Sequence, residues 1–584
     1  MKSIMTGNEA IARGAYEAGC LVAAAYPGTP STEILENVAS YKEIYSQWSV
    51  NEKVALEVAG GAAIAGARAL CAMKHVGLNV AADPLFTLAY TGINGGLVVV
   101  TADDPGLHSS QNEQDNRYYA LHAKIPMLEP SDSQECLDYI KYAFELSEEY
   151  DIPVLFRVTT RVCHSKSLVT LGSRQEVGVK EYKKDVKKYC MIPGFAKLRH
   201  PILEEKLKRL RELSDNSPLN QIIWGDKRIG IITSGISFQH AREVMGDAAS
   251  YLKIGMSFPL PERLIREFAQ AVEVLYVIEE NEPYIETFVK SLGISCIGKD
   301  AFPVCGELNP EIVQRVLSPE KATKTYAVDV QVPSRPPVLC AGCPHRGIFY
   351  ALRKYKDAVI TGDIGCYSLG ILPPLNATDT LICMGAGISA GIGFEKAFAQ
   401  ANRDTKVFGV MGDSTFFHSG ITSLIDAVYN RSKLAVIILD NRTTAMTGHQ
   451  ENPGTGKTLS GDVSTVIDIK EIARAVGVKQ ENILQVDPYD LIQTQEALKQ
   501  AYEATEPFVI VAKRSCALLK DVQRANTKCT VNAEKCSKCK LCLRLGCPAI
   551  AFKEGKMAID ESACNGCTVC MQVCNLGAIE RTGR

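Results

Sequence analysis

The sequence lacks an excess of charge of either sign. Lys and Arg number 64 and Asp and Glu 66, which gives a formal net charge of −2 at pH 7. A protein whose main partner is nucleic acid usually carries a basic surplus, because neutralising phosphates drives much of that binding. Composition therefore gives no support to a nucleic-acid partner.

Long apolar runs are also missing from the sequence. No stretch approaches the roughly 20 apolar residues that a membrane-spanning helix needs. The opening residues 1–9 carry charge, and no apolar segment of the kind found in secretory signals follows them. No short repeat or low-complexity tract interrupts the chain. We therefore expect no membrane association and a cytoplasmic protein.

Cysteine, by contrast, is abundant and unevenly placed. Of 21 cysteines, nine fall between Cys529 and Cys574. Without a secretion signal, such crowding is more typical of metal ligands than of disulfides. With 584 residues and 46 % hydrophobic residues, the chain has ample material for several folded domains.

Alternating helical and strand-like patterns predict an α/β protein. An Ala/Gly-rich helix at 51–69 and a strand at 97–100 represent the pattern in the first part of the chain. The predicted divisions are an α/β domain 1–165, a charged linker with a helix 166–225, a second α/β domain 226–325, a third 335–520 and a Cys-rich domain 528–584.

Two cysteine runs near the C-terminus resemble the pattern of bacterial two-cluster ferredoxins. In that pattern three thiolates of a CxxCxxC run bind one [4Fe–4S] cluster, and the distant fourth cysteine binds the other. Zinc bound by CxxC pairs is the alternative. The first run has four residues instead of three before Cys547-Pro548, so Cys547 is a less regular fourth ligand for the second cluster. Cys529 is a nearby spare for that position, or else an ordinary free thiol. The ligand sets that the resemblance implies are Cys536, Cys539, Cys542 and Cys574 for one cluster, and Cys564, Cys567, Cys570 and Cys547 for the other.

A strand at 407–411 followed by Gly412-Asp413-Ser414 resembles the first half of the diphosphate and Mg²⁺ motif of thiamine-diphosphate enzymes. A second strand ends 28 residues beyond Asp413, in Asp440-Asn441-Arg442-Thr443. Parallel strands of one βαβ unit end at the same sheet edge, where ligands bind. Asp413, Asn441 and the Thr443 carbonyl would supply three of the six oxygens that Mg²⁺ requires. Ser414 and Asp440 depart from the usual motif, and similar strand ends recur in many α/β folds.

Two further segments point to the same cofactor. Gly385 and Gly387 form a glycine-rich turn at a predicted helix start, whose N–H groups suit a phosphate; close helix–sheet packing is the alternative. The segment 340–345, Cys-Ala-Gly-Cys-Pro-His, resembles the pocket lining of 2-oxo-acid:ferredoxin oxidoreductases. His345 would then contact substrate or diphosphate, unless its role is structural.

Activation of thiamine needs a carboxyl group that shares a proton with its pyrimidine ring. The segment 51–62 resembles the helix that carries this glutamate, which makes Glu52 the first choice and Glu57 the fallback. Either could instead be a solvated helical carboxylate. Residues 26–33 resemble a substrate-side segment of the same enzymes, in which Thr29 would face the 2-oxo-acid carboxylate. The polar loop 103–117 is either functional or an ordinary turn.

From end to end the chain resembles the α subunits of indolepyruvate:ferredoxin oxidoreductases. The resemblance implies doubly wound α/β domains of pyrimidine-binding, transketolase C-terminal-like and diphosphate-binding type, plus a ferredoxin-like α+β domain. It implies thiamine diphosphate, Mg²⁺ and two [4Fe–4S] clusters as cofactors, and a smaller β subunit in an α2β2 assembly.

The activity implied is oxidation of an aryl 2-oxo acid with CoA to acyl-CoA and CO2, with electrons passed to ferredoxin. Other 2-oxo-acid:ferredoxin oxidoreductases and non-oxidative thiamine decarboxylases remain alternatives, as does a pure electron-transfer adaptor. The substrate side chain and the CoA site are not defined by any residue of the sequence.

Overall fold

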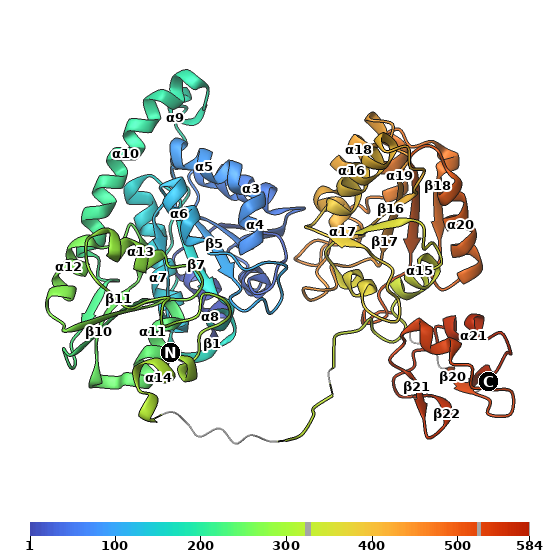
Figure 1. Cartoon of the computed structure of the whole chain (residues 1–584). Coiled ribbons are helices and arrows are strands. Elements are labelled where there is room, and N and C mark those ends of the chain that lie inside the picture. The colour runs from blue at the N-terminus through green and yellow to red at the C-terminus, as the bar shows by residue number, and fades with distance from the viewer. Residues whose placement is uncertain (322–328, 334, 523–526, 583–584) are drawn as a thin grey trace. The chain divides into compact units, whose positions relative to one another are not determined.

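The computed structural model describes residues 1–321, 329–333, 335–522 and 527–582. The chain forms two compact units, Met1–Asp329 and Val330–Arg584 (Figure 1). Each unit is built on parallel β-structure covered by helices, so the expected α/β class is confirmed.

The first unit contains a seven-stranded sheet of order β12-β6-β7-β5-β4-β2-β3. All neighbouring strands pair in parallel except β12 with β6. Central strands such as β5 are buried along their whole length, as expected for a sheet covered on both faces. The strands are β2 (Val22–Ala25), β3 (Tyr45–Trp48), β4 (Ala69–Lys74), β5 (Leu97–Asp103), β6 (Met127–Leu128), β7 (Val154–Thr159) and β12 (Met256–Phe258).

Helices of this sheet begin with local capping signals. Asn51 caps α3 by accepting the Val54 N–H, and Asp132 caps α7 by accepting that of Glu135. The helices are α1 (Gly7–Glu17), α2 (Thr32–Val38), α3 (Glu52–Ala65), α4 (His75–Val80), α5 (Ala82–Thr91), α6 (Arg117–Ala123), α7 (Ser133–Tyr150) and α8 (Thr160–His164).

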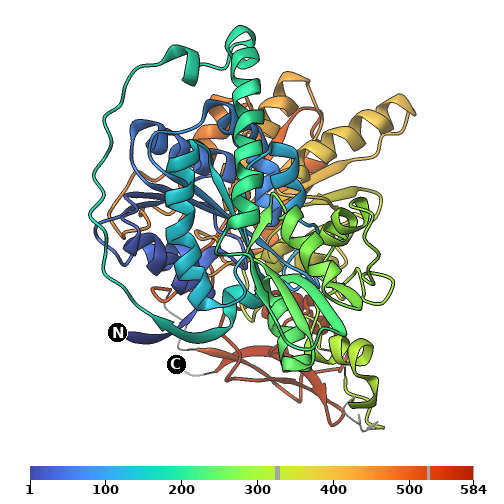
Figure 2. The same cartoon turned by 90° about the vertical axis from the view of Figure 1, so that its left-hand side faces the viewer.

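The segment 166–225 is more than the solvated linker that we expected. Its first part, β8 (Lys166–Thr170), pairs antiparallel with β1 (Lys2–Thr6), and its last part, β9 (Gln221–Ile223), joins a second sheet. Between them an extended chain runs along the outside of the unit to α9 (Val186–Tyr189) (Figure 2). The helix α10 (Pro193–Asn216) packs on the domain through apolar side chains that are buried, namely Leu203, Leu207 and Leu210.

A four-stranded sheet of order β13-β10-β11-β9 completes the first unit. Its strands β10 (Ile229–Ser234), β11 (Ser250–Ile254) and β13 (Val274–Ile278) are parallel. The strand β12 that follows this sheet's β11 pairs instead with β6 of the larger sheet. Its helices are α11 (Gly235–Met245), α12 (Glu262–Gln270), α13 (Tyr284–Ser291) and α14 (Pro310–Leu317).

Buried ion pairs connect the two sheets of the first unit. Arg117 Nη1 donates to Glu279 Oε2 at 2.6 Å and its Nε donates to Asp115 Oδ1 at 2.9 Å. Arg157 Nε donates to Asp103 Oδ2 at 2.7 Å. The acids outnumber the arginines in this network, because Glu129 and Glu280 are buried there as well. A buried carboxyl group without a cationic partner is less stable in its ionised form, and its pKa is raised.

Glu280 is the residue whose neutralisation we expect to change stability. Burial is the main cause that raises its pKa to about 7; Glu307 and Glu129 add to the shift and Arg157 opposes it. Because the folded state binds this proton more tightly than the unfolded state, stability falls as pH rises through 7. Glu280→Gln keeps an acceptor for the Leu308 N–H. It should therefore stabilise the protein at pH 8 by about 2 kcal/mol more than at pH 5.

Thermal unfolding of the wild type and of Glu280→Gln at pH 5 and pH 8 tests this expectation. Glu243→Gln, at an exposed position of α11, is the matched control and should change neither melting temperature. Equal shifts at both pH values would show that Glu280 does not titrate in this range.

The second unit contains a six-stranded parallel sheet of order β15-β14-β16-β17-β19-β18. Its strands are β14 (Val359–Gly362), β15 (Thr380–Leu381), β16 (Val407–Gly412), β17 (Ala435–Asp440), β18 (Ile483–Val486) and β19 (Phe508–Lys513). The covering helices are α15 (His345–Leu352), α16 (Ala386–Gln400), α17 (Asp413–Thr415), α18 (Ile421–Tyr429), α19 (Ile469–Ala475) and α20 (Leu491–Glu503).

The Cys-rich segment packs on α15 and α20 of the same unit (Figure 1). Two antiparallel pairs frame it: its first strand β20 (Lys528–Val531) pairs with its last strand β23 (Ile579–Thr582), and β21 (Ile550–Lys553) forms a hairpin with β22 (Lys556–Ile559). Arg346 Nη1 of α15 donates to the Leu545 carbonyl at 2.6 Å. A single short helix, α21 (Val569–Val573), lies in the second cysteine run. Among the described residues, no helix is long and apolar enough to cross a membrane.

Candidate cofactor and metal sites

Three polar groups converge where strands β16 and β17 end. One terminal atom of the Asn441 side-chain amide lies 2.7 Å from the Thr443 carbonyl oxygen and 3.3 Å from Oδ1 of Asp413. The amide nitrogen suits this place when no cation is bound, since it can donate to both oxygens. The amide oxygen suits it when a cation lies between the three groups, because oxygens at 2.0–2.1 Å from an octahedral Mg²⁺ lie about 2.9 Å apart. The spacing of the three groups therefore fits a small divalent cation.

Asp413 is held by fixed neighbours. Its Oδ1 accepts the Ser414 N–H at 2.9 Å, and its Oδ2 accepts Nδ2 of Asn452 at 3.2 Å. Burial is the main cause that raises its pKa to about 7, and the nearby Asp440 carboxylate raises it further. A buried anionic pair of this kind is stabilised by a cation. Ser414, which departs from the usual motif, donates or accepts a hydrogen bond with Thr444 Oγ1 at 2.9 Å.

The glycine turn at 385–387 has a different role from the one we expected. The N–H groups of Gly385 and Gly387 donate to Oδ2 of the buried Asp363, at 2.8 and 3.0 Å, and are not directed at an open phosphate site. A Cβ on Gly387 would lie 2.6 Å from the Val410 carbonyl, and one on Gly385 2.2 Å from Ser419 Oγ. Close packing of α16 on the sheet, the alternative left open above, thus accounts for both glycines.

His345 lies beside the three polar groups. Its Nε2 is 3.4 Å from Nδ2 of Asn441, and its ring meets that of Tyr367 edge to face at 5.9 Å. Burial lowers the pKa of His345 to about 4, so the ring is neutral at physiological pH. A neutral imidazole here can orient the Asn441 amide but does not supply a positive charge.

The segment before His345 connects the three polar groups to the Cys-rich segment. Gly342 adopts a φ of +70°, and a Cβ there would overlap the Asn565 side chain at 1.7 Å. The Tyr489 hydroxyl donates to the Gly342 carbonyl at 2.5 Å. Ala341 and Gly342 line the same cavity as the second cysteine run. Sequence reasoning missed this contact because Gly342 and Asn565 are 223 positions apart in the chain.

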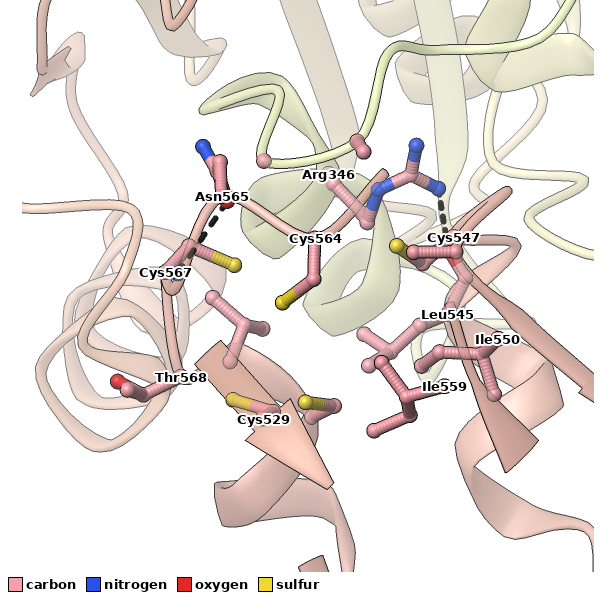
Figure 3. A pocket seen from close by; sticks show the side chains of 15 residues that line it. Arg346, Cys529, Leu545, Cys547, Ile550, Ile559, Cys564, Asn565, Cys567 and Thr568 are labelled. Carbon is pink, nitrogen blue, oxygen red and sulfur yellow. Dashed lines mark hydrogen bonds between the residues drawn. The ribbon is translucent and has the colours of Figure 1, made fainter. Parts of the chain in front are cut away.

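Two cavities of the Cys-rich segment gather the thiols. One is lined by Cys536, Cys539, Cys542 and Cys574. The other is lined by Cys564, Cys567, Cys570 and Cys547, together with Cys529 (Figure 3). Each cavity thus combines one CxxCxxC run with the distant fourth cysteine of the other. No three Cys, His, Asp or Glu side chains in the described part of the chain converge on a single metal ion.

In the first unit, Glu52 and Glu57 lie in contrasting environments. Glu52 opens α3 and is buried, with its carboxylate against α4: a Cβ on Gly77 would lie 2.7 Å from Oε1. Glu57 lies one and a half turns later, is exposed, and pairs with Lys53. A buried carboxyl at the edge of the sheet is the better candidate for proton sharing with a ligand.

Thr29 lies half-buried after β2, at the same edge of the sheet as β4. Lys74, the last residue of β4, packs its side chain against Gly28, where a Cβ would lie 3.2 Å from Lys74 Cγ and Cδ. Its Nζ donates to the Ser109 carbonyl at 2.8 Å. Burial lowers the pKa of Lys74 to about 8, against the opposing effect of Asp104 and Glu52. No motif had indicated this cation beside the Thr29 segment.

The polar loop after β5 is firmly held. Asn116 donates to Thr101 Oγ1 at 2.6 Å, and His75 Nε2 lies 3.2 Å from the Asn112 carbonyl. Asp104 accepts the Ser109 N–H at 2.8 Å. These contacts fix the loop against α4 and β5.

Comparison with known proteins identifies the class first. Residues 13–210 match the family described as pyruvate flavodoxin/ferredoxin oxidoreductase, thiamine diP-bdg, and residues 363–512 match thiamine pyrophosphate enzyme, C-terminal TPP binding domain. The chain is thus an oxidoreductase of the thiamine-diphosphate-dependent 2-oxo-acid:ferredoxin class.

Individual relatives narrow this class to one family. Indolepyruvate oxidoreductase subunit IorA of Methanothermobacter thermautotrophicus is 42 % identical over 100 % of this chain and 98 % of its own length. The subunit of the same name from Pyrococcus horikoshii is 42 % identical, over 99 % and 97 %. 2-Oxoglutarate synthase subunit KorA of Methanothermobacter marburgensis is 28 % identical over 47 % of this chain and 87 % of its own. The chain belongs to the indolepyruvate oxidoreductase subunit IorA family, which confirms the resemblance drawn from its sequence.

Proposed function

We propose that the protein oxidises aryl 2-oxo acids of the indolepyruvate class with CoA, releasing acyl-CoA and CO2 and passing electrons to ferredoxin. Thiamine diphosphate supplies the carbanion chemistry at the 2-oxo carbon, and two [4Fe–4S] clusters accept electrons singly. The names of the IorA relatives, which call them subunits of an indolepyruvate oxidoreductase, support this substrate class and a partner subunit. In this proposal the partner is a smaller β subunit, and the assembly is α2β2.

In this proposal the second unit holds the diphosphate and Mg²⁺, with domain 335–520 as the diphosphate domain. Asp413, Asn441 and the Thr443 carbonyl bind the cation, while Gly412 and Ser414 shape the adjoining loop. Gly385 and Gly387 let the start of α16 pack closely beside this site, where a side chain would clash with Val410 or Ser419. His345 orients the Asn441 amide.

The first unit supplies the groups that act on the organic parts of cofactor and substrate. Glu52 shares a proton with the pyrimidine ring, in a pyrimidine-binding domain that spans 1–165. Thr29 faces the substrate carboxylate. Domain 226–325 is of the transketolase C-terminal type.

Residues 528–584 form the ferredoxin-like domain of the proposal. The two four-thiol sets are Cys536, Cys539, Cys542 and Cys574, and Cys564, Cys567, Cys570 and Cys547. Zinc fits this arrangement less well, because thiolates at 2.3 Å from one zinc converge closely, whereas the four thiolates of a cubane bind four separate irons.

One observation carries the proposal: the segment 341–345 lines the thiol cavity of the second cysteine run at one end and contacts Asn441 of the cation site at the other. A non-oxidative decarboxylase needs no electron acceptor, and an electron-transfer adaptor needs no diphosphate site. The test is anaerobic ferredoxin reduction by the complex of this chain with its partner subunit, across a panel of 2-oxo acids. We expect CoA-dependent reduction that is fastest with indolepyruvate; CO2 release without ferredoxin reduction would contradict the proposal.

Cys542→Ala should separate the early chemistry from electron transfer. Cys542 lines the cavity that has only four thiols, so its loss removes one of the four ligands of that cluster and leaves no thiol to replace it. Exchange of labelled CO2 with the substrate carboxylate precedes electron transfer and should survive. Ferredoxin reduction should fall at least about 10-fold. Cys190→Ala, at an exposed position of the first unit, is the control. Wild-type ferredoxin reduction in a variant shown to lack that cluster would exclude this electron path.

A further inference from the structure

The cavity of the second cysteine run contains one thiol more than a cluster requires. Five cysteines line it, whereas the cavity of the first run has four. In Figure 3 the sulfur atoms of Cys567 and Cys547 reach in from opposite sides, with Cys564 between them and Cys529 on the strand below. A [4Fe–4S] cubane takes four thiolates. One of the five is therefore surplus.

The surplus thiol is fixed by the fold and is not a mobile surface group. Cys529 lies in β20, where it pairs in register with Arg581 of β23, and it is 1 % exposed. Its side chain lines the same cavity as those of Cys570 and Cys564 and packs in the same cluster of buried residues. Because successive side chains of a strand point to opposite faces, the pairing of β20 with β23 keeps the Cβ of Cys529 directed at the cavity. The sequence had suggested an ordinary free thiol at this position; its side chain is instead part of the cavity wall.

Cys547 reaches the cavity by a different route from the other three predicted ligands of this cluster. Cys564, Cys567 and Cys570 come from one continuous run, whereas Cys547 follows Gly546, which has a φ of +64°. Its segment is anchored to α15 through the bond from Arg346 to the Leu545 carbonyl. Four residues instead of three separate it from Cys542. Cys547 is thus the ligand whose position depends on contacts outside the cysteine run.

We propose that Cys529 is a fifth thiol of this cluster site, which does not bind iron while Cys547 is present and replaces Cys547 as ligand when that cysteine is lost. The inference rests on the proposed function, because it assumes a [4Fe–4S] cluster in this cavity. In the exchange one iron–sulfur bond to Cys547 is replaced by one to Cys529, and the Cys529 thiol releases its proton to water. No electron is gained or lost.

Iron and acid-labile sulfide per chain, measured after anaerobic purification of the complex with its partner subunit, test the proposal. Wild type should contain about eight irons per chain. Cys547→Ala and Cys529→Ala should each keep about eight. Cys547→Ala/Cys529→Ala should drop to about four. The control Cys547→Ala/Cys190→Ala removes an exposed thiol of the first unit instead and should keep the count of Cys547→Ala. Electron paramagnetic resonance of the reduced Cys547→Ala protein should show a cluster signal changed from that of wild type.

Each contrary result has a distinct meaning. Wild type without iron would refute the proposed function, and with it this inference. Cys547→Ala with as little iron as the double variant would overturn the replacement alone, as would loss of a cluster in Cys529→Ala.

A second measurement applies if Cys547→Ala does not fold. The midpoint potential of Cys529→Ala should then be lower than that of wild type, because a thiol against the cluster can donate a hydrogen bond to its sulfurs. An unchanged potential would show that Cys529 does not contact the cluster.

Discussion

Asp413→Ala protein, purified with its partner subunit, should contain almost no thiamine diphosphate or Mg²⁺. The change removes the only full negative charge among the three converging groups, so the Asn441 amide and the Thr443 carbonyl that remain cannot hold the cation at the diphosphate. Changes to residues that support a metal's ligands without binding the metal commonly weaken metal binding about 10- to 100-fold. Loss of a direct ligand should weaken it more. Extraction of the cofactor and measurement of its fluorescence give the thiamine content of each variant.

We expect the loss of cofactor to follow from removal of the carboxylate at position 413, and not from removal of any nearby acidic residue. Asp404→Ala, at an exposed position between α16 and β16, is the matched control and should retain full cofactor. Circular dichroism should be unchanged in both variants, because the strands around Asp413 are buried by apolar contacts. Normal thiamine content in Asp413→Ala would place the diphosphate site elsewhere.

Glu52→Gln should retain the cofactor but slow hydrogen exchange at its C2 carbon by about 10²- to 10⁴-fold. Glutamine keeps the size of the side chain and its fit against Gly77, yet it cannot share a proton with the pyrimidine ring. Binding and activation are thereby separated: Asp413→Ala loses the cofactor, whereas Glu52→Gln keeps it in a less reactive form. Proton NMR of acid-quenched samples in deuterated buffer measures the exchange rate.

The fallback glutamate provides the control. Glu57 is exposed and paired with Lys53, so Glu57→Gln should exchange at the wild-type rate. If Glu57→Gln slows exchange and Glu52→Gln does not, the assignment moves to Glu57, and the resemblance of segment 51–62 to the family's helix has been aligned one and a half turns too early.

The sequence by itself determined the α/β class and the family. Strand-like runs that end in Gly412-Asp413 and in Asp440-Asn441 are local patterns, and the spacing of the CxxCxxC runs follows from how a short loop can surround a cubane. Patterns of this kind survive without knowledge of the fold, because the residues that must meet are neighbours in sequence or end adjacent parallel strands. For the same reason Glu52 could be chosen at the start of an Ala/Gly-rich helix.

Only the tertiary structure decided which groups are already engaged and which thiols share a cavity. The N–H groups of Gly385 and Gly387 were expected to face a phosphate, but Asp363, which directly follows β14, accepts them. The sequence left Cys529 as either a spare ligand or an ordinary free thiol, and only its place in β20, paired with β23, puts it in the cavity of the second run. Hydrogen-bond partners and cavity walls depend on residues far apart in the chain, and their meeting is fixed by packing rather than by any local pattern.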